Sequence, residues 1–327
     1  MKKKYQKRDI AFYLILLALI LVMLYCALQI FETTVLYTGE EDTELHESKT
    51  IIRGDTAYFP RQDITTVLVL GIDQYGPVKE SGSYNNRGAA DMDMLLIFDE
   101  TAHSCTVLHL NRDTMLEMPV LGIGGRRAGS YYGQLALSHT YGTGLADSCE
   151  NTRQTISDFL YGLDIDYYVS MNMDAIAILN DAVGGVTVTV TDDFSQVDPT
   201  ITKGQVHLMG EHAVSFVRTR KDVGDQLNLS RIERQKEYID GFVEAFRAKQ
   251  KSDTEFIVSA YEKVEPYIVT DCSVNAISGM IDRYGDYRIA EVVTPEGKNV
   301  MGEKYFEFHV DMEKLDELIL RLFYAAK

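Results

Sequence analysis

The chain has 327 residues, a formal net charge of −17 at pH 7 and 7 histidines. An acidic chain of this kind is not expected to bind nucleic acid, because neutralising phosphates requires a large basic face. The sequence has no HExxH, GxSxG, P-loop or CxxC motif and its histidines are scattered. These observations exclude the common zinc protease, serine hydrolase, P-loop and dithiol classes.

The N-terminus combines a basic segment with a long apolar run. Residues 10–28 contain no charge and are long enough to span a bilayer. The run is longer than the core of a signal peptide and no small-x-small cleavage site follows it, so we predict an uncleaved transmembrane helix over residues 10–30. Basic residues precede the span and acidic residues follow it: Lys2, Lys3, Lys4, Lys7 and Arg8, then Glu32, Glu40, Glu41 and Asp42. This asymmetry predicts a single-pass cell-membrane protein with a cytoplasmic tail at 1–9 and an extracellular C-terminal domain.

The exterior part of the chain alternates between buried-strand patterns and helical patterns after a polar linker at residues 31–61. Strands are predicted at 65–71, 92–98, 105–110, 166–171 and 186–190, and helices at 150–160, 174–183, 210–216 and 230–249. This alternation predicts an α/β protein, a three-layer α-β-α sandwich around a central mixed sheet. Residues 119–144 are rich in Gly, Tyr and Ser and are interpreted as a long loop at the mouth of a pocket.

The C-terminal quarter continues the mixed pattern. Residues 254–264, 273–284 and 313–324 are predicted helices, with strands near Ile289 and Phe306. We interpret residues 251–327 as an α/β extension of the domain at 62–250 rather than a separate domain. Outside the predicted span lie three cysteines with no metal-like spacing, Cys105, Cys149 and Cys272. One disulfide or three buried thiols would fit, and buried thiols are favoured.

Arginines cluster near residue 220 although the chain is acidic. If residues 216–221 are extended, Arg218 and Arg220 point the same way and present two planar guanidinium groups to one ligand. Arginines beside a helix N-terminus favour phosphate or pyrophosphate. A solvated, salt-bridged helix start is the alternative.

The helix that follows is expected to begin at a capping box. Ser230 and Glu233 have the required spacing, which places Arg231 and Gln235 on one face of the first turns.

Charged residues also lie at the predicted strand ends. Asp73 follows one apolar strand and Asp91 precedes the next, so both carboxylates are expected at one edge of the sheet. Oxygen ligands with a phosphate-bearing substrate favour Mg²⁺. A turn cap is the alternative for Asp73. Asp93 points away from its apolar neighbours and is either a solvated residue or a further metal ligand. Arg112 would either bind the anion or pair locally with Asp113.

The order of these motifs resembles the LytR-CpsA-Psr family of cell-envelope proteins. The resemblance covers roughly residues 65–247 and is carried by Val69-Leu-Gly-Ile-Asp73, Arg87 with Asp91-Met-Asp-Met-Leu-Leu96, Leu110-Asn-Arg-Asp-Thr114, Ile165-Asp-Tyr-Tyr-Val169, Met173-Asp-Ala175, the 179–188 segment, Leu208-Met-Gly-Glu-His-Ala213, Val217-Arg-Thr-Arg220 and Ser230-Arg-Ile-Glu-Arg-Gln235. Each motif alone is weak, but their order after an N-terminal anchor is specific.

The resemblance implies a membrane-anchored phosphotransferase that moves a glycopolymer from a polyprenyl pyrophosphate carrier to peptidoglycan through a phosphodiester link. By position, the metal ligands would be Asp73 and Asp91, and the pyrophosphate contacts Arg87, Arg112, Arg218, Arg220, Arg231 and Gln235. Asp91, Arg112, Arg218 and Arg220 would act in catalysis, and Asp225 would be the acidic partner of Arg231. The chain departs from the family pattern in the spacing of Arg87 and Asp91, in the length of 221–229, and in having Gln134-Leu-Ala for Lys-Ile/Leu-Asn. An envelope sensor that binds the lipid without turnover and a pyrophosphatase are the alternative functions.

Overall fold

The computed structural model describes residues 50–122, 124–219, 221–224, 228–253 and 255–326. The predicted cytoplasmic tail and transmembrane helix lie outside these residues. Within the described ranges no helix has the length and apolar character needed to cross a membrane. These described residues divide into two compact units, residues 50–60 with 325–326 and residues 61–324. In the first unit, β1 (Ile51–Arg53) and β2 (Thr56–Pro60) pair antiparallel, and β15 (Tyr324–Ala326) completes a three-stranded sheet.

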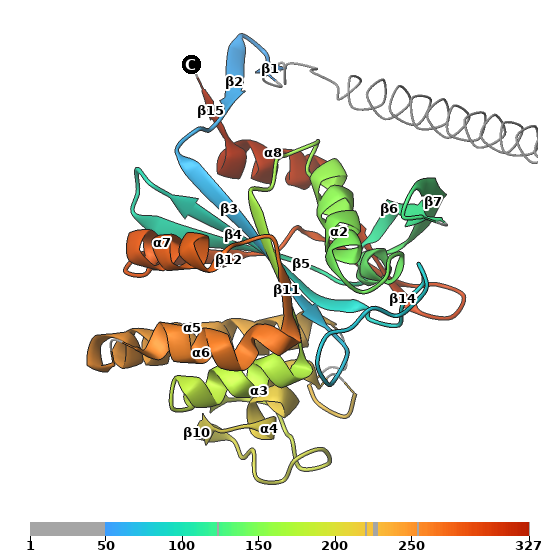
Figure 1. The fold of residues 1–327 in the computed structure, drawn as a ribbon. Helices are drawn as coiled ribbons and strands as arrows, with labels where there is room; N and C mark the ends of the chain where they lie inside the picture. The colour runs from blue at the N-terminus through green and yellow to red at the C-terminus, as the bar shows by residue number, and fades with distance from the viewer. Residues whose placement is uncertain (1–49, 123, 220, 225–227, 254, 327) are drawn as a thin grey trace, which may run out of the picture. The chain divides into compact units, whose positions relative to one another are not determined.

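The second unit is built on a six-stranded mixed sheet, which confirms the predicted mixed α/β class (Figure 1). Its order is β11-β8-β3-β4-β5-β12, with bounds Ile268–Thr270, Tyr167–Asn172, Ile64–Ile72, Ala90–Asp99, Ser104–Leu110 and Arg288–Val293. β3, β4 and β5 pair antiparallel, whereas β8 pairs parallel with β3 and β12 parallel with β5. β3 occupies the centre because its apolar run can be buried on both faces.

Helices pack against both faces of this sheet. On one face, Leu68, Leu95 and Leu108 pack with residues of α2 (Ala146–Phe159) and α8 (Met312–Phe323). On the other, Met94 and Val107 pack with Ile239 of α5 (Asn228–Ser252). α7 (Val274–Tyr284) covers the same second face, where Tyr284 stacks on Phe98 with ring centroids 4.6 Å apart.

A second apolar cluster lies beyond α5, around the stacked rings of Phe194 and Phe216. Figure 1 shows its elements on the α5 side of the central sheet. They are α3 (Met173–Ala182), the antiparallel pair β9 (Val186–Val190) and β10 (Gly204–Leu208), α4 (Glu211–Arg218), and α6 (Phe256–Val264), which the short helix η2 (Glu265–Tyr267) follows. α4 and the start of α5 bring residues of the predicted arginine cluster to this part of the molecule.

The prediction of a long loop at 119–144 is wrong. The segment belongs to an antiparallel hairpin of β6 (Met115–Leu121) and β7 (Arg127–Gln134), followed by the 3-10 helix η1 (Leu135–Thr140). The turn reverses through Gly124 and Gly125, whose φ values of 80° and 71° are accessible to glycine without strain. A second hairpin, β13 (Gly297–Met301) and β14 (Phe306–Val310), lies beside the first.

Buried thiols, rather than a disulfide, account for the three cysteines. Cys105, Cys149 and Cys272 are all buried and unbridged. Burial raises the pKa of Cys105 and Cys149 to about 12, so these thiols are held in the protonated form.

Candidate functional site

A β-bulge at the end of β3 and β4 positions the two predicted carboxylates. Gly71 pairs with Met92 and Ile72 pairs with Ala90, so Asp91 is the extra residue on β4. A bulge turns a side chain away from the regular pleat and is common beside functional sites. Asp73 lies on the adjacent strand end, where its N–H donates to Ala89 O at 3.0 Å. The prediction that Asp73 and Asp91 share one edge of the sheet is confirmed.

Asp91 is held between two arginines. Its Oδ1 accepts a hydrogen bond from Arg112 Nη1, and its Oδ2 lies 3.2 Å from Arg231 Nη1. Arg231 Nη2 also donates to the main-chain oxygen of Asp91 at 2.7 Å. The side chain of Asp91 is 12% exposed and that of Arg231 is 4% exposed, so this ion pair is largely shielded from water. Arg112 and Arg231, from different parts of the chain, are thereby fixed at one point.

Arg112 also lies near Asp113, the residue with which a local ion pair was the alternative prediction. Its Nε is 3.4 Å from Asp113 Oδ1, a longer contact than the hydrogen bond to Asp91. The residue therefore joins the site and the adjacent turn rather than pairing only locally.

Arg218 brings a third arginine to the same sheet edge. Its Nε and Nη2 donate to Asp73 Oδ1 at 3.1 and 2.8 Å, and its guanidinium lies 5.8 Å from the ring centroid of Tyr75. Partial burial opposes the charge, but Asp73 and, more weakly, Tyr75 and Asp91 raise the pKa of Arg218 above its ordinary value. The side chain remains 43% exposed and can exchange its carboxylate partner for an anionic ligand.

The backbone that presents Arg218 is helical, so the hypothesis of an extended stretch starting at Phe216 is wrong for residues 216–218. Arg218 is the last residue of α4, and Thr219 resumes an extended conformation. Val214, Phe216 and Val217 are buried and Arg218 is exposed, as expected for a helix with one buried side. The Arg-x-Arg spacing also matches the two-residue repeat of a strand, so the spacing alone does not distinguish the two. Arg220 lies outside the described residues, as does Asp225.

Contacts from α5 lock the end of α4 in place. Gln235 Nε2 donates to Val217 O at 3.1 Å, and Arg234 donates to Phe216 O at 3.3 Å and to Thr219 O. Arg234 also reaches Asp192 Oδ2 at 2.6 Å. Arg234 was not among the predicted site residues, because carbonyl partners in another helix leave no signal in the sequence. Gln235 is itself buried, so in this structure it positions α4.

The predicted capping box at Ser230 is also wrong. α5 begins at Asn228, which places Ser230 inside the first turn of the helix. Arg231 and Gln235 still share one side of the helix, as their spacing of four predicts.

Arg87 lies exposed in the connection between β3 and β4, and its neighbours are firmly anchored. The Asn86 amide donates to His139 O at 2.8 Å and to Ser148 Oγ at 3.0 Å, while Asn86 Oδ1 accepts from Gly88 N–H at 2.7 Å. The Gly88 carbonyl in turn contacts His139 Nδ1 at 2.8 Å. The flanking residues therefore restrict the backbone of Arg87. Asn86 escaped sequence analysis because its partners are distant in the chain.

Asp93 is buried rather than solvated. Its side chain is 0% exposed, and among the described residues neither carboxylate oxygen has a hydrogen-bond partner. Burial raises its pKa well above the ordinary value, although Arg112 and Arg231 act in the opposite direction. The acid is therefore favoured in its neutral form and is shielded from an external ligand.

The described residues contain no cluster of three or more His, Cys, Asp or Glu side chains suited to a metal ion. They offer instead the carboxylates of Asp73 and Asp91 on adjacent strand ends. Both donors of Arg218 bond to Oδ1 of Asp73, and Asp73 Oδ2 has no hydrogen bond among the described contacts. Mg²⁺ commonly binds one or two carboxylates and takes its other ligands from water and substrate phosphates. The donor set fits such an ion.

Comparison with known proteins gives a consistent result. The LytR_cpsA_psr family model matches residues 25–322. An uncharacterised protein of Staphylococcus aureus is 25% identical over 324 residues, covering 94% of this chain and 73% of that protein. The polyisoprenyl-teichoic acid–peptidoglycan teichoic acid transferase TagU of Bacillus cereus is 27% identical over 188 residues, covering 56% of this chain and 53% of that protein. The match therefore spans about half the length of this transferase.

Solved structures share the fold. TagT bound to LI-WTA matches with a TM-score of 0.59 and 24% identity, over 80% of this chain and 90% of that chain. A Streptococcus agalactiae protein, gbs0355, matches with a TM-score of 0.65 and 19% identity, over 80% and 86%. At these identities the likeness shows the fold alone.

Proposed function

Because this chain belongs to the LytR-CpsA-Psr family, we propose that it is a membrane-anchored phosphotransferase. Its donor is a glycopolymer on a polyprenyl pyrophosphate carrier, and its acceptor is peptidoglycan. The predicted transmembrane helix at residues 10–30 would hold the domain at the outer surface of the cell membrane, where both substrates meet.

The observation that carries this proposal is the convergence of Arg112, Arg218 and Arg231 on Asp73 and Asp91 at one sheet edge. The arginines come from three separated segments of an acidic chain, which is a costly arrangement for stability alone. Pyrophosphate carries the charge that such a site neutralises.

The reaction requires positioning and charge neutralisation. An acceptor sugar hydroxyl attacks the phosphorus atom that bears the donor sugar, and a new P–O bond forms. The bond from this phosphorus to the bridging oxygen breaks, polyprenyl phosphate leaves, and the hydroxyl proton passes to solvent. Arginines stabilise the negative charge on the transferring group, and a single arginine can contribute several kcal/mol to phosphoryl transfer.

Exposure divides the arginines into two roles. Arg87 and Arg218 are exposed and would bind phosphate oxygens directly, together with Arg112. Arg231 is buried against Asp91 and would hold that carboxylate in position. Gln235 would act indirectly, because its hydrogen bond to Val217 O holds the end of α4 that carries Arg218.

Magnesium is the proposed cofactor, held by Asp73 and Asp91. When bound it would neutralise pyrophosphate charge and help to orient the phosphates. Release of Arg218 from Asp73 would free this arginine for the substrate and Asp73 for the ion.

The test uses the full-length protein in detergent with a polyprenyl-pyrophosphate-linked saccharide, Mg²⁺ and soluble peptidoglycan glycan strands. The expected result is a saccharide linked to the strands through phosphodiester, formed with release of polyprenyl phosphate and suppressed by EDTA. Saccharide phosphate released to water would indicate a pyrophosphatase. Intact lipid that stays bound without product would indicate a sensor. Either outcome would overturn the transferase proposal.

A further inference from the structure

Six large apolar side chains are exposed on the two hairpins beside the site. They are Tyr131 and Tyr132 of β7, Val300 and Met301 of β13, Phe306 of β14 and Tyr305 in the β13–β14 turn, with exposed fractions from 42% for Phe306 to 69% for Tyr305. Tyr131 and Val300 directly precede Tyr132 and Met301 and so point to the opposite faces of their strands. The hairpins are far apart in sequence but adjacent in space, because Phe308 N–H donates to Asp113 O at 2.8 Å and Thr114 forms a parallel bridge with Phe308. Exposed apolar side chains gathered in this way mark a binding surface.

One side chain ties this surface to the candidate site. Gln134 Nε2 donates to Asp113 Oδ1 at 3.0 Å and to Phe306 O at 2.8 Å. Asp113 directly follows Arg112 and lies 3.4 Å from its Nε. The main chain of Phe306 therefore contacts the same glutamine that contacts Asp113, the residue after Arg112.

The surface is rigid rather than a mobile loop. Phe308 is buried and anchors the second hairpin, while Met301 and Phe306 form a cross-strand pair on the same side as Phe308. Tyr132 lies two residues before Gln134 and so faces the same side of β7. A binding surface on paired strands holds its side chains in place before the ligand arrives.

We propose that Tyr132, Met301, Tyr305 and Phe306 bind the acceptor saccharide, an inference that rests on the transferase function proposed above. Aromatic rings pack against the C–H faces of sugar rings, and neighbouring polar groups bond their hydroxyls. The position next to Asp113, which follows Arg112, suits a second substrate whose hydroxyl must reach the phosphorus atom.

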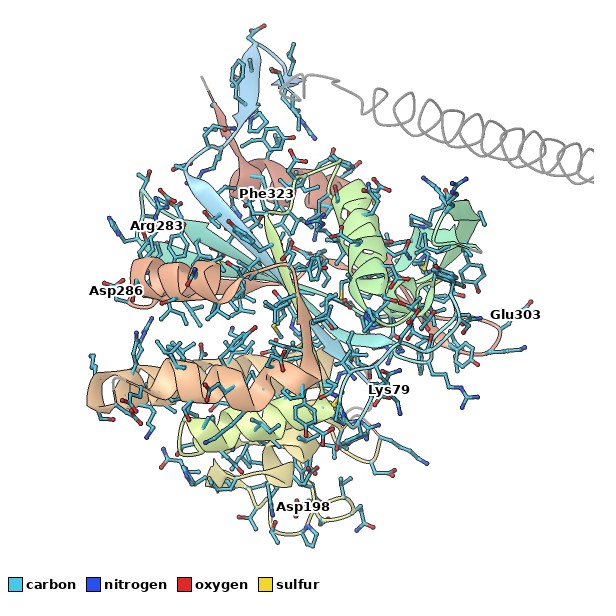
Figure 2. All side chains as sticks on the ribbon, in the orientation of Figure 1. Lys79, Asp198, Arg283, Asp286, Glu303 and Phe323 are labelled. Atoms are coloured by element: carbon cyan, nitrogen blue, oxygen red, sulfur yellow. The ribbon has the colours of Figure 1, made fainter. Side chains whose placement is uncertain are left out.

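Charge favours a saccharide over the other occupants. The charges of the two hairpins are mixed, with Arg126, Arg127, Lys298 and Lys304 against Glu117, Glu303 and Glu307, and Figure 2 shows Glu303 on the projecting turn. An anionic membrane would instead require a large excess of basic residues. A narrow strip of rings among mixed charges fits a glycan strand.

The binding test uses the full-length protein in detergent and purified, peptide-free glycan strands of peptidoglycan. We expect the Tyr132→Ala/Phe306→Ala variant to bind these strands at least ten times more weakly than wild type, and Tyr132→Phe and Phe306→Tyr to retain binding because a ring remains. Val274→Ala is the matched control, since Val274 is 49% exposed on α7. Should the double variant melt early, Tyr305→Ala in the turn replaces it. Wild-type affinity in the alanine variants, or an equal loss in the control, would overturn the proposal.

Kinetic measurements distinguish a failure of the proposed saccharide-binding surface from a failure of the proposed transferase function. The alanine variants should raise the KM for the acceptor at least ten-fold while KM for the lipid donor and kcat change less than two-fold. An unchanged acceptor KM with active transfer would refute the surface and leave the transferase intact. Conversely, ring-dependent glycan binding without any transfer would retain the surface as a glycan-binding site and refute the transferase.

Discussion

Arg231 holds Asp91 through both its side chain and its main chain. Nη1 lies 3.2 Å from Asp91 Oδ2 and Nη2 donates to Asp91 O at 2.7 Å. The bulge makes this double contact accessible, because it turns the backbone of Asp91 out of the regular ladder. The planar guanidinium reaches the two acceptors with two separate nitrogens in a fixed geometry, whereas an ammonium offers a single nitrogen.

Arg231→Lys should therefore lower both transfer and stability. We expect the transfer rate to fall about 10- to 100-fold, since the loss of a charge-assisted hydrogen bond costs roughly 1–3 kcal/mol. The melting temperature should fall as well, because the replaced contact is buried. A double-mutant cycle with Asp91→Asn tests whether the two residues act together, and we expect a coupling energy of at least about 0.5 kcal/mol. Additive effects in the cycle would contradict the pairing.

Arg218→Lys should lower transfer without lowering stability. Arg218 is substantially exposed and its pair with Asp73 is open to solvent, so the pair contributes at most about 1 kcal/mol to folding. Its planar donors matter for a phosphate ligand, and we expect a loss of roughly 1–3 kcal/mol in transition-state stabilisation.

Arg283→Lys is the matched control for Arg218→Lys. Arg283 is 61% exposed, pairs with Glu100 at 2.7 Å, and lies on α7 well apart from the loop bearing Lys79 (Figure 2). It should leave both transfer rate and melting temperature unchanged. Equal kinetic effects of the two substitutions would show that Arg218 has no special part in the reaction.

The strands and helices could be predicted where the pattern of apolar residues directly reflects which side chains are buried. The uninterrupted apolar run at 65–71 predicts β3 because both faces of that strand are buried. The hairpin at 115–134 lacks such a signal. β7 reads Arg-Ala-Gly-Ser-Tyr-Tyr-Gly-Gln and is mostly exposed, so its conformation depends on pairing with β6.

The site was predictable in its residue types more than in its geometry. Asp73 and Asp91 follow from strand ends, and the arginine cluster near residue 220 is visible in the acidic sequence. The burial of Arg231 and the anchoring of Asn86 depend on partners more than fifty positions away. Such partners leave no local pattern, so sequence analysis placed Arg231 and Gln235 in contact with the ligand although both are buried.

Asp93→Asn should stabilise the protein, increasingly so as pH rises. The raised pKa means that folded Asp93 keeps a proton that the unfolded chain releases. The acid's contribution is therefore fully present below its unfolded pKa and is lost as pH rises toward the folded value. Asparagine cannot ionise and removes this loss. Thermal melts should show a larger gain at pH 8 than at pH 5. A gain that is independent of pH would contradict a neutral buried acid.

His139→Gln should weaken the acid sensitivity of folding. Burial lowers the pKa of His139 from 6.5 to about 4, against opposing effects of the Gly88 carbonyl and Asp147. Between these values the unfolded chain binds a proton that the folded chain does not, so stability falls as pH drops from 6.5 toward 4. The shift corresponds to about 3 kcal/mol. Denaturant unfolding at several pH values measures the slope, which the variant should reduce by nearly one proton. The same slope in the wild type and in His139→Gln would show that His139 does not control this pH dependence.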